Sequence, residues 1–349
     1  MTPLPIPHAP FPHPGPRRRA VILILCLIAC LVEALSACNA RKTRDEGQGE
    51  VLTLRLKWLF NVSTAGELWA LDKGGFERHG LRVLLREGGV EHNAIKEIEL
   101  GRAQFGIASA DQILQAAGKG ADIVVLAQIF QANPLQWIYD ETRFTVQDVS
   151  DLKGRCIGIT YGGNDEAIFS ALMERYGITD RDVRLYAVHY DYSPFWRGEV
   201  DLWPIYRNVE GVVLAEKIQA NGGRAGFFDP GAAGISFVAN SLVTSRLFYE
   251  TQPEKVRAFT EAVTEGWYEA MAPQNLHAAV EIVRLRDPET RPELIAEQIT
   301  ATRQLVVQPG RPVGTIDKKA WKETAQILAA HGLLDRKPDF TRLLAGPPP

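Results

Sequence analysis

Three short loops of this 349-residue chain combine polar residues that could bind a small ligand. They span residues 61–66, 109–111 and 161–165, and each lies between an expected strand and an expected helix. The first backbone N–H groups of a helix have no partner within that helix, so they point at whatever lies before it. Such groups would suit a small anion such as a sulfonate, a nitrate or a phosphate.

Carboxylates in these loops argue against an anion. Asp111 and Asp165 stand where helices are expected to begin, and the loops contain no Arg or Lys. A bound anion would therefore face carboxylates instead of a guanidinium group. Carboxylates that accept N–H donors, with Asn61 as a further polar partner, favour a flat nitrogen heterocycle. Alternatively, both aspartates only stabilise their helices as caps or first-turn acids.

Aromatic residues accompany the loops. Trp58 ends an expected strand and Tyr161 opens the third loop, so either could stack on an aromatic ligand. The segment 201–211 (DLWPIYRNVEG) is expected to form the far wall of the site, with Trp203, Tyr206, Asn208 and Glu210. The alternative for any large aromatic residue is packing in the core.

Metal and catalytic motifs are not found in the sequence. His189 and Asp191 alternate at an expected strand end, but a third ligand at suitable spacing is missing, so we predict no metal site. The chain has no Ser-His-Asp order, paired catalytic carboxylates, phosphate-binding glycine loop or dinucleotide fingerprint. We therefore predict no cofactor and a binding protein instead of an enzyme.

Strands and helices alternate from residue 51 onward. Apolar patterns predict strands at 51–57, 81–86, 105–108, 123–130, 156–160, 184–188, 200–203 and 236–244. Expected helices are 67–72, 92–100, 111–117, 166–176, 212–221 and several after 253. This rhythm predicts an α/β fold of two lobes, with mostly parallel sheets and a central ligand cleft at the strands' carboxyl ends. We assign residues 51–140 and 237–340 to lobe 1, and residues 141–236 to lobe 2.

The first 37 residues have the features of an export signal. Three arginines at 17–19 precede thirteen apolar residues, a run too short to span a bilayer. Residues 35–38 (LSAC) resemble a bacterial lipobox, in which Cys38 is acylated and becomes the new N-terminus. The alternative is an ordinary cleavage site with an incidental cysteine. Residues 38–50 are polar and are expected to form a tether.

Charge and cysteine content exclude two classes of protein. With 39 Lys and Arg against 42 Asp and Glu, the net charge is -3, so no basic field exists for nucleic acid. Of the four cysteines, Cys26, Cys30 and Cys38 lie in the signal region, which leaves Cys156 alone. A disulfide framework is therefore excluded. We expect a monomer.

Eight short motifs occur in a recognisable order. They are 56–61 (LKWLFN), 73–76 (KGGF), 101–107 (GRAQFGI), 133–135 (NPL), 151–155 (DLKGR), 198–201 (GEVD), 253–259 (PEKVRAF) and 265–267 (EGW). Together they resemble the periplasmic solute-binding proteins of ABC importers in the sulfonate, nitrate and thiamine-pyrimidine group. The resemblance implies the type II periplasmic binding protein fold, with a hinge that closes two lobes. It also implies an ABC permease and its ATPase as partners.

The resemblance and the site residues combine into one hypothesis. The chain is expected to be an exported lipoprotein, anchored to the membrane and facing the periplasm or cell exterior, that binds a thiamine-precursor pyrimidine or a flavin-like ring. Trp58 and Tyr161 would stack on the ring, while Asn61, Asp111 and Asp165 would bind its edge. The alternatives are a binding protein for a sulfonate or nitrate, a ligand sensor, and an enzyme that resembles pyrimidine synthases, whose cysteine-rich motif this chain lacks.

Overall fold

The computed structural model describes residues 50–349, except for residues 90, 162, 190 and 236. The expected signal (1–37), the lipidated Cys38 and all but the last residue of the tether (38–50) lie outside the described residues. Residues 51–349 form one unit. No helix within the described part is both long and apolar enough to cross a membrane.

The first sheet has five strands in the order β2-β1-β3-β10-β4. The strands are β1 (Val51–Arg55), β2 (Arg82–Arg86), β3 (Phe105–Ala108), β4 (Ile123–Gln128) and β10 (Ser241–Ser245). Strands β1, β2 and β3 are parallel, while β10 runs antiparallel to β3 and β4. The helices that follow the first three strands are α2 (Ala65–Asp72), α3 (Gly75–Arg78), α4 (Ala94–Glu99) and α5 (Ala110–Gly118).

The second sheet repeats this pattern. Its strands are β5 (Leu135–Asp140), β6 (Cys156–Ile159), β7 (Arg184–Ala187), β8 (Trp203–Tyr206) and β9 (Ala225–Phe228). Strand β5 lies antiparallel between β8 and β9, and β6 pairs in parallel with β7. A parallel bridge from Ile157 to Leu202, just before β8, joins the two groups. The resulting order is β7-β6-β8-β5-β9. Its one antiparallel strand, β5, is fourth in this order, as β10 is in the first sheet.

The antiparallel strand of each sheet is the one that the chain enters when it crosses from the other sheet. Among the described residues, no helix separates β4 from β5 or β9 from β10. The crossover geometry that makes successive strands parallel therefore does not apply to these pairs. The sheets are therefore mixed: one strand in each runs against the others, and the remaining strands have the parallel direction that the sequence predicts. The pairing also puts β5 in the second sheet, although a boundary after residue 140 would leave it in lobe 1. Below, lobe 1 and lobe 2 denote the first and second sheets with their helices.

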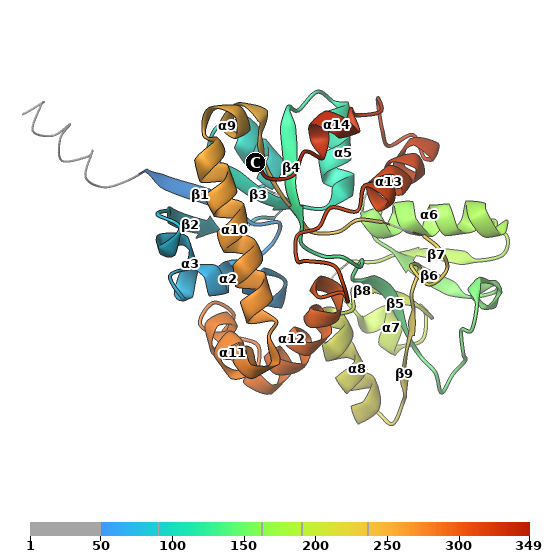
Figure 1. The fold of residues 1–349 in the computed structure, drawn as a ribbon. Helices are drawn as coiled ribbons and strands as arrows, with labels where there is room; N and C mark the ends of the chain where they lie inside the picture. Colours follow the sequence, from blue (N-terminus) through green and yellow to red (C-terminus); the bar gives the residue numbers. More distant parts are fainter. Residues whose placement is uncertain (1–49, 90, 162, 190, 236) are drawn as a thin grey trace, which may run out of the picture. The chain divides into compact units, whose positions relative to one another are not determined.

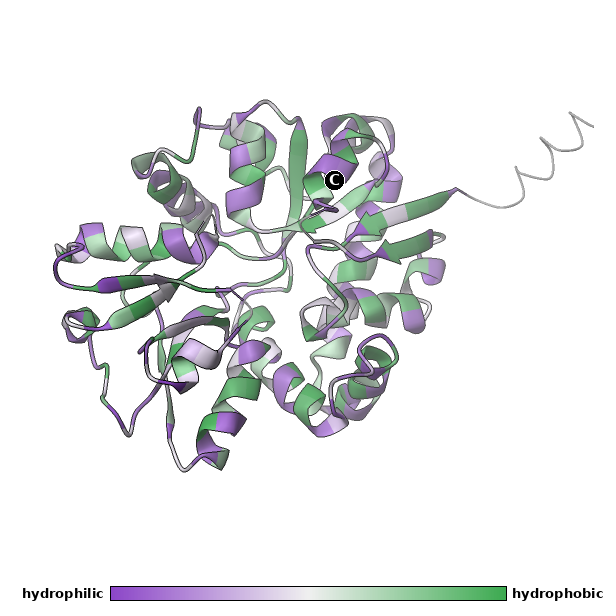
Figure 2. Ribbon diagram, turned by 180° about the vertical axis from the view of Figure 1, so that it is seen from behind, coloured by the Kyte–Doolittle hydropathy of each residue, from purple (hydrophilic) through white to green (hydrophobic). Residues whose placement is uncertain are grey.

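Helices cover both sheets (Figure 1). Lobe 2 contains α6 (Asn164–Tyr176), α7 (Ser193–Trp196) and α8 (Glu210–Ala220). After β10 come α9 (Arg246–Thr251), α10 (Pro253–Ala270), α11 (Leu276–Arg284), α12 (Pro292–Val306), α13 (Lys318–Ala330) and α14 (Phe340–Leu343). Figure 2 shows hydrophobic strands inside and helices that turn hydrophilic residues outward, as amphipathic helices should.

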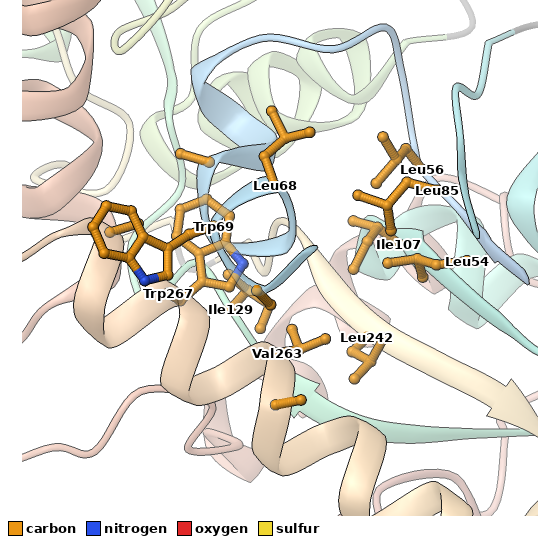
Figure 3. Packing of buried hydrophobic residues seen from close by; sticks show 14 of the residues in the cluster. Leu54, Leu56, Leu68, Trp69, Leu85, Ile107, Ile129, Leu242, Val263 and Trp267 are labelled. Atoms are coloured by element: carbon orange, nitrogen blue, oxygen red, sulfur yellow. The ribbon is translucent and has the colours of Figure 1, made fainter. Parts of the chain in front are cut away.

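The core of lobe 1 packs α10 closely against α2 (Figure 3). Trp267 of α10 is fully buried, and its ring lies where a Cβ atom on Gly66 of α2 would be. A Cβ atom on Gly266 would likewise overlap the carbonyl oxygen of Gly66. Both positions therefore require glycine because the two helices approach too closely for a Cβ atom. They do not require it for a special backbone conformation.

A second hydrophobic core is shared by both sheets. It joins Ile113 of α5 and Val125 of β4 to Trp137 of β5 and Phe169 of α6. Trp321 of α13 belongs to the same core and is fully buried. Helix α13 therefore packs against elements of both lobes, beside α5 and α6.

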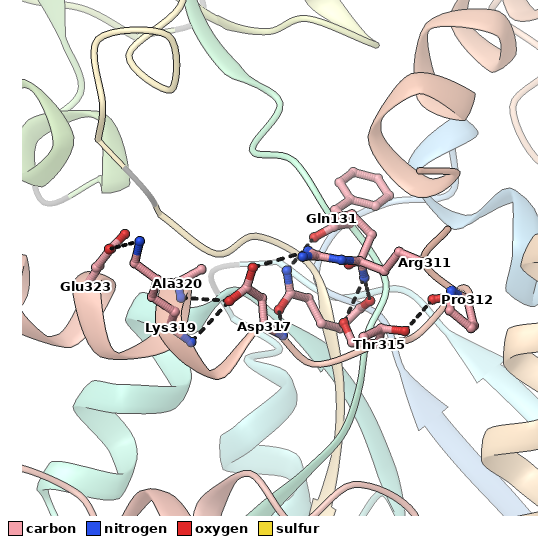
Figure 4. Close-up of polar contacts among 10 residues, drawn as sticks. Gln131, Arg311, Pro312, Thr315, Asp317, Lys319, Ala320 and Glu323 are labelled. Carbon is pink, nitrogen blue, oxygen red and sulfur yellow. Dashed lines mark hydrogen bonds and ion pairs between the residues drawn. The ribbon is translucent and has the colours of Figure 1, made fainter. Parts of the chain in front are cut away.

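Polar contacts tie the segment before α13 to the first crossing of the chain (Figure 4). Gln131, just after β4, donates a hydrogen bond to the carbonyl oxygen of Thr315 at 3.0 Å. The backbone N–H of Asp317 donates to Oε1 of Gln128 at 3.0 Å, and Asp317 caps α13. Arg311 lies 3.2 Å from the Asp317 carboxylate. These contacts hold the start of α13 beside the crossing.

Candidate ligand-binding cleft

A cavity of about 240 Å³ lies between the two lobes. We call it the interlobe cavity. Its walls are Lys57, Trp58, Leu59, Asn61, Ser63, Thr64, Ile107 and Asn240 from lobe 1, and Tyr206, Val209 and Glu210 from lobe 2. Most of the lobe 1 residues follow the carboxyl end of β1, which is where ligands bind in open α/β sheets.

A second cavity of about 380 Å³ adjoins it within lobe 2. Tyr206 and Glu210 line both cavities. The other walls of this lobe 2 cavity include Thr160, Asn164, Asp165, His189, Tyr192 and Trp203. Larger hollows lie between α6 and α13, beside α10, and between residues 117–123 and 336–343, but their walls are helices and loops away from the carboxyl ends of the strands. The two adjoining cavities are therefore the better candidate site.

The loop that carries Trp58 is held firmly in place. The Arg55 guanidinium, buried at the end of β1, donates to the carbonyl oxygen of Glu87 at 2.6 Å. The Glu87 carboxylate accepts the backbone N–H of Phe60 at 2.9 Å, and the N–H of Gly88 donates to the Trp58 carbonyl at 3.0 Å. A Cβ atom on Gly88 would overlap a carbonyl oxygen of this loop. The indole of Trp58 is nevertheless 40% exposed, so it is available for contact in the cavity wall.

Lys57 provides the positive charge of the interlobe cavity. Its ammonium donates to the Tyr206 hydroxyl at 2.8 Å and lies 5.1 Å from the ring centroid. Burial alone would lower the pKa of Lys57, but attraction to Tyr206, Asp111 and Glu210 outweighs it, so the pKa is raised. Lys57 therefore stays charged at neutral pH, facing two carboxylates.

The carboxylates of Glu210 and Asp111 differ in their hydrogen bonds. Oε2 of Glu210 accepts the backbone N–H of Tyr206 at 3.1 Å, and burial raises the pKa of Glu210. Oδ1 of Asp111 is buried and has no hydrogen-bond partner among the residues that the structure describes. Asp111 does not cap α5, because Ser109 and Gln112 form the capping box of that helix. The charge of Lys57 is thus balanced within the protein.

The residues predicted from the sequence fall into three groups. Trp58, Asn61 and Tyr206 line the interlobe cavity. Asp165 and Trp203 line the lobe 2 cavity instead, and Tyr206 joins the two. Asp111 lies close enough to attract Lys57, but it is not among the described residues that line either cavity. Tyr161 is 58% exposed and, within the described part of the chain, is also outside both cavity linings.

Three of these side chains also have local structural partners. Asn61 accepts the backbone N–H of Ser63 at 2.8 Å and so caps a 3₁₀ helix, η1 (Val62–Thr64). Oδ2 of Asp165 accepts the N–H of Thr160 at 2.6 Å, and burial raises the pKa of Asp165 to about 6. Trp203 is only 2% exposed and packs against Tyr192 with ring centroids 5.3 Å apart.

Sequence reasoning did not identify Lys57 and Asn240 as site residues. The three loops themselves contain no Lys or Arg, but Lys57 precedes the first loop by a few residues and its side chain reaches the cavity. Its place at the end of the expected strand 51–57 was the available signal. Asn240 lay inside the expected strand 236–244, whereas β10 begins one residue later. Within the described ranges, no group of three or more His, Cys, Asp or Glu could hold a metal ion.

Two mixed β-sheets covered by helices, a chain that crosses twice between the lobes, and a cavity between these lobes define the periplasmic binding protein fold. The aliphatic sulphonate-binding protein SsuA of Escherichia coli matches with a TM-score of 0.68 over 86% of this chain and 94% of its own, at 15% identity. The nitrate-binding protein NrtA of Synechocystis PCC 6803 matches at 0.59, over 82% and 83%, with 12% identity. The desulfurization enzyme DszB also matches, at 0.60 over 85% and 97%, with 14% identity. These likenesses confirm the expected fold.

The family follows from the sequence comparison. Residues 61–275, more than half of the chain, match the NMT1/THI5-like family, so the chain belongs to that family. A Haemophilus influenzae protein named as a candidate for thiamine biosynthesis is 24% identical over 163 residues. This match covers 46% of the chain and 52% of the relative, so it spans about half of the relative's length.

Proposed function

We propose that this protein is the substrate-binding protein of an ABC-type importer, which captures a small ligand by lobe closure and delivers it to a permease and its ATPase. The observation that carries the proposal is the interlobe cavity, because residues of both lobes form its walls. A ligand there contacts both lobes at once and so favours the closed state. The binding proteins among the solved structures of this fold support the proposal, while DszB supports the enzymatic alternative.

The ligand that fits these walls best is a small nitrogen heterocycle. Trp58 and Tyr206 offer aromatic surface, and Asn61, Asn240 and Glu210 offer polar atoms for the ring edge. A cavity of about 240 Å³ is smaller than the roughly 300–1,000 Å³ typical of drug-sized ligands. A single ring, such as a thiamine-precursor pyrimidine, therefore suits it better than a flavin, which would also need the lobe 2 cavity.

One observation favours a second candidate, a sulfonate or a similar small anion. Lys57 lines the interlobe cavity together with the hydroxyl group of Ser63, and such donors bind oxyanions. Asp111 and Glu210 weaken this candidate because they already attract the ammonium of Lys57. The heterocycle remains our first proposal.

Export and membrane anchoring are part of the proposal, and they rest on the sequence of the first 38 residues. Growth with radiolabelled palmitate should label the full chain but not a Cys38→Ala variant. Unlabelled protein that is nonetheless exported would indicate ordinary signal cleavage and contradict the anchor.

A ligand screen tests the function. Thermal unfolding is followed with 4-amino-5-hydroxymethyl-2-methylpyrimidine, thiamine, riboflavin, ethanesulfonate and nitrate, because a ligand at 100 times its Kd adds about 2.7 kcal/mol. A shift with the pyrimidine that decreases in Trp58→Ala supports the proposal, and loss of stacking should weaken binding by about 1–3 kcal/mol. A shift with ethanesulfonate or nitrate alone would support the second candidate. No shift with any compound would contradict a binding function for this group of ligands.

A further inference from the structure

The chain crosses between the lobes twice, from β4 to β5 and from β9 to β10. Asn240 lies where these two crossings meet. It directly precedes β10, and its carbonyl oxygen accepts the backbone N–H groups of Ile129 and Phe130 at 2.9 and 3.1 Å. Those two residues follow β4, where the chain leaves lobe 1 for the first time. Asn133 adds a second tie between the crossings, since its Nδ2 donates to the carbonyl oxygen of Phe237 at 2.8 Å. The backbone of Asn240 is therefore bonded to the first crossing through its carbonyl oxygen, close to the second tie at Asn133.

The side chain of Asn240 is different from the other polar groups of the cavity. It lies in the wall of the interlobe cavity and is only 5% exposed. Its Oδ1 is buried, with no hydrogen-bond partner among the described residues. Buried side-chain oxygens are paired in the large majority of cases, so an unpaired one in a cavity wall indicates a partner that comes from outside.

Two other buried, unpaired oxygens lie nearby, but neither belongs to a residue that lines the interlobe cavity. Oδ1 of Asp111 is one of them, and the charge of its carboxylate is balanced by Lys57. Oδ1 of Asn208 is the other, yet Asn208 is absent from the cavity lining and its Nδ2 is bonded to Ser63 and Thr302. Of the described residues that line the interlobe cavity, Asn240 alone has a buried, unpaired side-chain atom.

We propose that Asn240 is a specificity-determining residue, whose Oδ1 accepts a hydrogen bond from an N–H group of the ligand. This inference rests on the proposed binding function and adds to it a requirement for a ring that bears an amino group. The hydrogen-bonded backbone holds the acceptor in place before the ligand arrives, so little side-chain ordering accompanies binding. A ligand without an N–H or O–H donor leaves Oδ1 unpaired and is rejected.

A matched pair of probes tests this role. 4-Amino-2-methylpyrimidine and 2,4-dimethylpyrimidine have the same ring and nearly the same size, but only the first has N–H donors. The full chain should bind the amino compound at least about tenfold more tightly by calorimetry. Asn240→Leu should bind both probes equally, whereas Asn240→Asp, which retains an acceptor, should keep the preference. Asn133→Ala loses a tie between the crossings without touching the cavity wall, so it should also keep the preference.

The outcomes separate this inference from the proposed function. Equal binding of both probes to the unaltered chain, or an unchanged preference in a folded Asn240→Leu variant, overturns the role of Asn240 while the binding function stands. Binding of ethanesulfonate that Asn240→Asp abolishes would also overturn it, because Asn240 would then act as a donor to an anion. Failure of the folded chain to bind any of the three probes contradicts the proposed binding of a small nitrogen heterocycle itself. Circular dichroism and thermal unfolding of each variant verify that it is folded.

Discussion

Lys57 and Tyr206 join the two lobes across the interlobe cavity. Nζ of Lys57 donates to the Tyr206 hydroxyl at 2.8 Å, although the two residues are 149 positions apart in the sequence. Lys57 follows β1 in the first sheet, and Tyr206 ends β8 in the second. The bond can exist only while the lobes are close together. The bond therefore links the charged ammonium of Lys57 to the closed arrangement of the two lobes.

Removing the Tyr206 hydroxyl should favour the open state of the ligand-free protein. Tyr206→Phe keeps the ring but loses the bond from Lys57 and a longer one, 3.3 Å, from Asn164 within lobe 2. A hydrogen bond to a charged group is worth about 1.5–3 kcal/mol, enough to shift a two-state equilibrium by tenfold or more. Small-angle X-ray scattering should show a larger radius of gyration without ligand.

Tyr186→Phe is the matched control for this experiment. Tyr186 lies in β7 of the same lobe and is absent from the described lining of both cavities. It should leave the radius of gyration unchanged. An equal radius for Tyr206→Phe and the unaltered protein would show that the bond from Lys57 does not hold the lobes together.

Asn208 should act as a second, buried link between the lobes. It is fully buried after β8, and its Nδ2 donates to the hydroxyl oxygens of Ser63 and Thr302 at 3.1 and 3.0 Å. Asn208→Ala leaves these hydroxyls without their donor, so we expect a loss of about 1–3 kcal/mol in unfolding free energy. Urea denaturation measures this loss.

A double-mutant cycle with Ser63→Ala identifies the contact. If Asn208 and Ser63 interact directly, the two losses should not add, and the coupling should reach at least about 0.5 kcal/mol. Strictly additive losses would mean that Asn208 stabilises the protein through Thr302 alone. Ser150→Ala in place of Ser63→Ala is a suitable control, because Ser150 lies on a different part of lobe 2.

The alternation of elements could be predicted from the sequence because it depends on local patterns. The apolar run 105–108 and the amphipathic helices after Pro253 are examples, and both appear as expected. The direction of β5 and β10 could not be predicted in this way, because it depends on strands far away in the chain. The four-residue strand β9 escaped notice for the same reason, since it is defined by its pairing with β5.

The candidate site was predictable where residues stand at strand ends. Trp58 and Tyr206 follow or end strands of different sheets, and both line the interlobe cavity. Asn240 lay hidden in an expected strand, and its position becomes meaningful only through its contacts with Ile129 and Phe130. Tyr161 had the same local signal as Trp58, yet its side chain is mostly exposed. Local signals identify strand ends but not the direction in which each side chain points.

Gly66 should not tolerate a side chain. Gly66→Ala would put a methyl group into the ring of Trp267, and α2 and α10 would have to separate. Overpacking of this kind typically costs about 1–3 kcal/mol, and more where the backbone cannot move. Urea denaturation should show the loss. In a Trp267→Phe background the smaller ring leaves room, so the same substitution should cost less there. Equal losses in both backgrounds would contradict this steric cause.

Glu67 should make the protein less stable as the pH rises. This glutamate of α2 is 1% exposed, and its Oε2 has no hydrogen-bond partner among the described residues. Burial raises the pKa of Glu67 from 4.5 to about 7, so the folded protein holds this proton more tightly than the unfolded chain does. Below pH 4.5 both states are protonated and the full stability is present. Between pH 4.5 and 7 the unfolded chain loses the proton first, and stability falls.

Glu67→Gln removes this pH dependence while keeping the size of the side chain. The glutamine cannot ionise, so the variant should exceed the unaltered protein in unfolding free energy at pH 8 by up to about 3 kcal/mol, relative to their difference at pH 4.5. Urea denaturation at both pH values measures the two differences. Glu77→Gln, on the exposed surface of α3, should change neither value appreciably. If Glu67→Gln retained the full decline in stability between pH 4.5 and 7, another group would be responsible, and buried Asp165, with its pKa raised to about 6, would be the next to test.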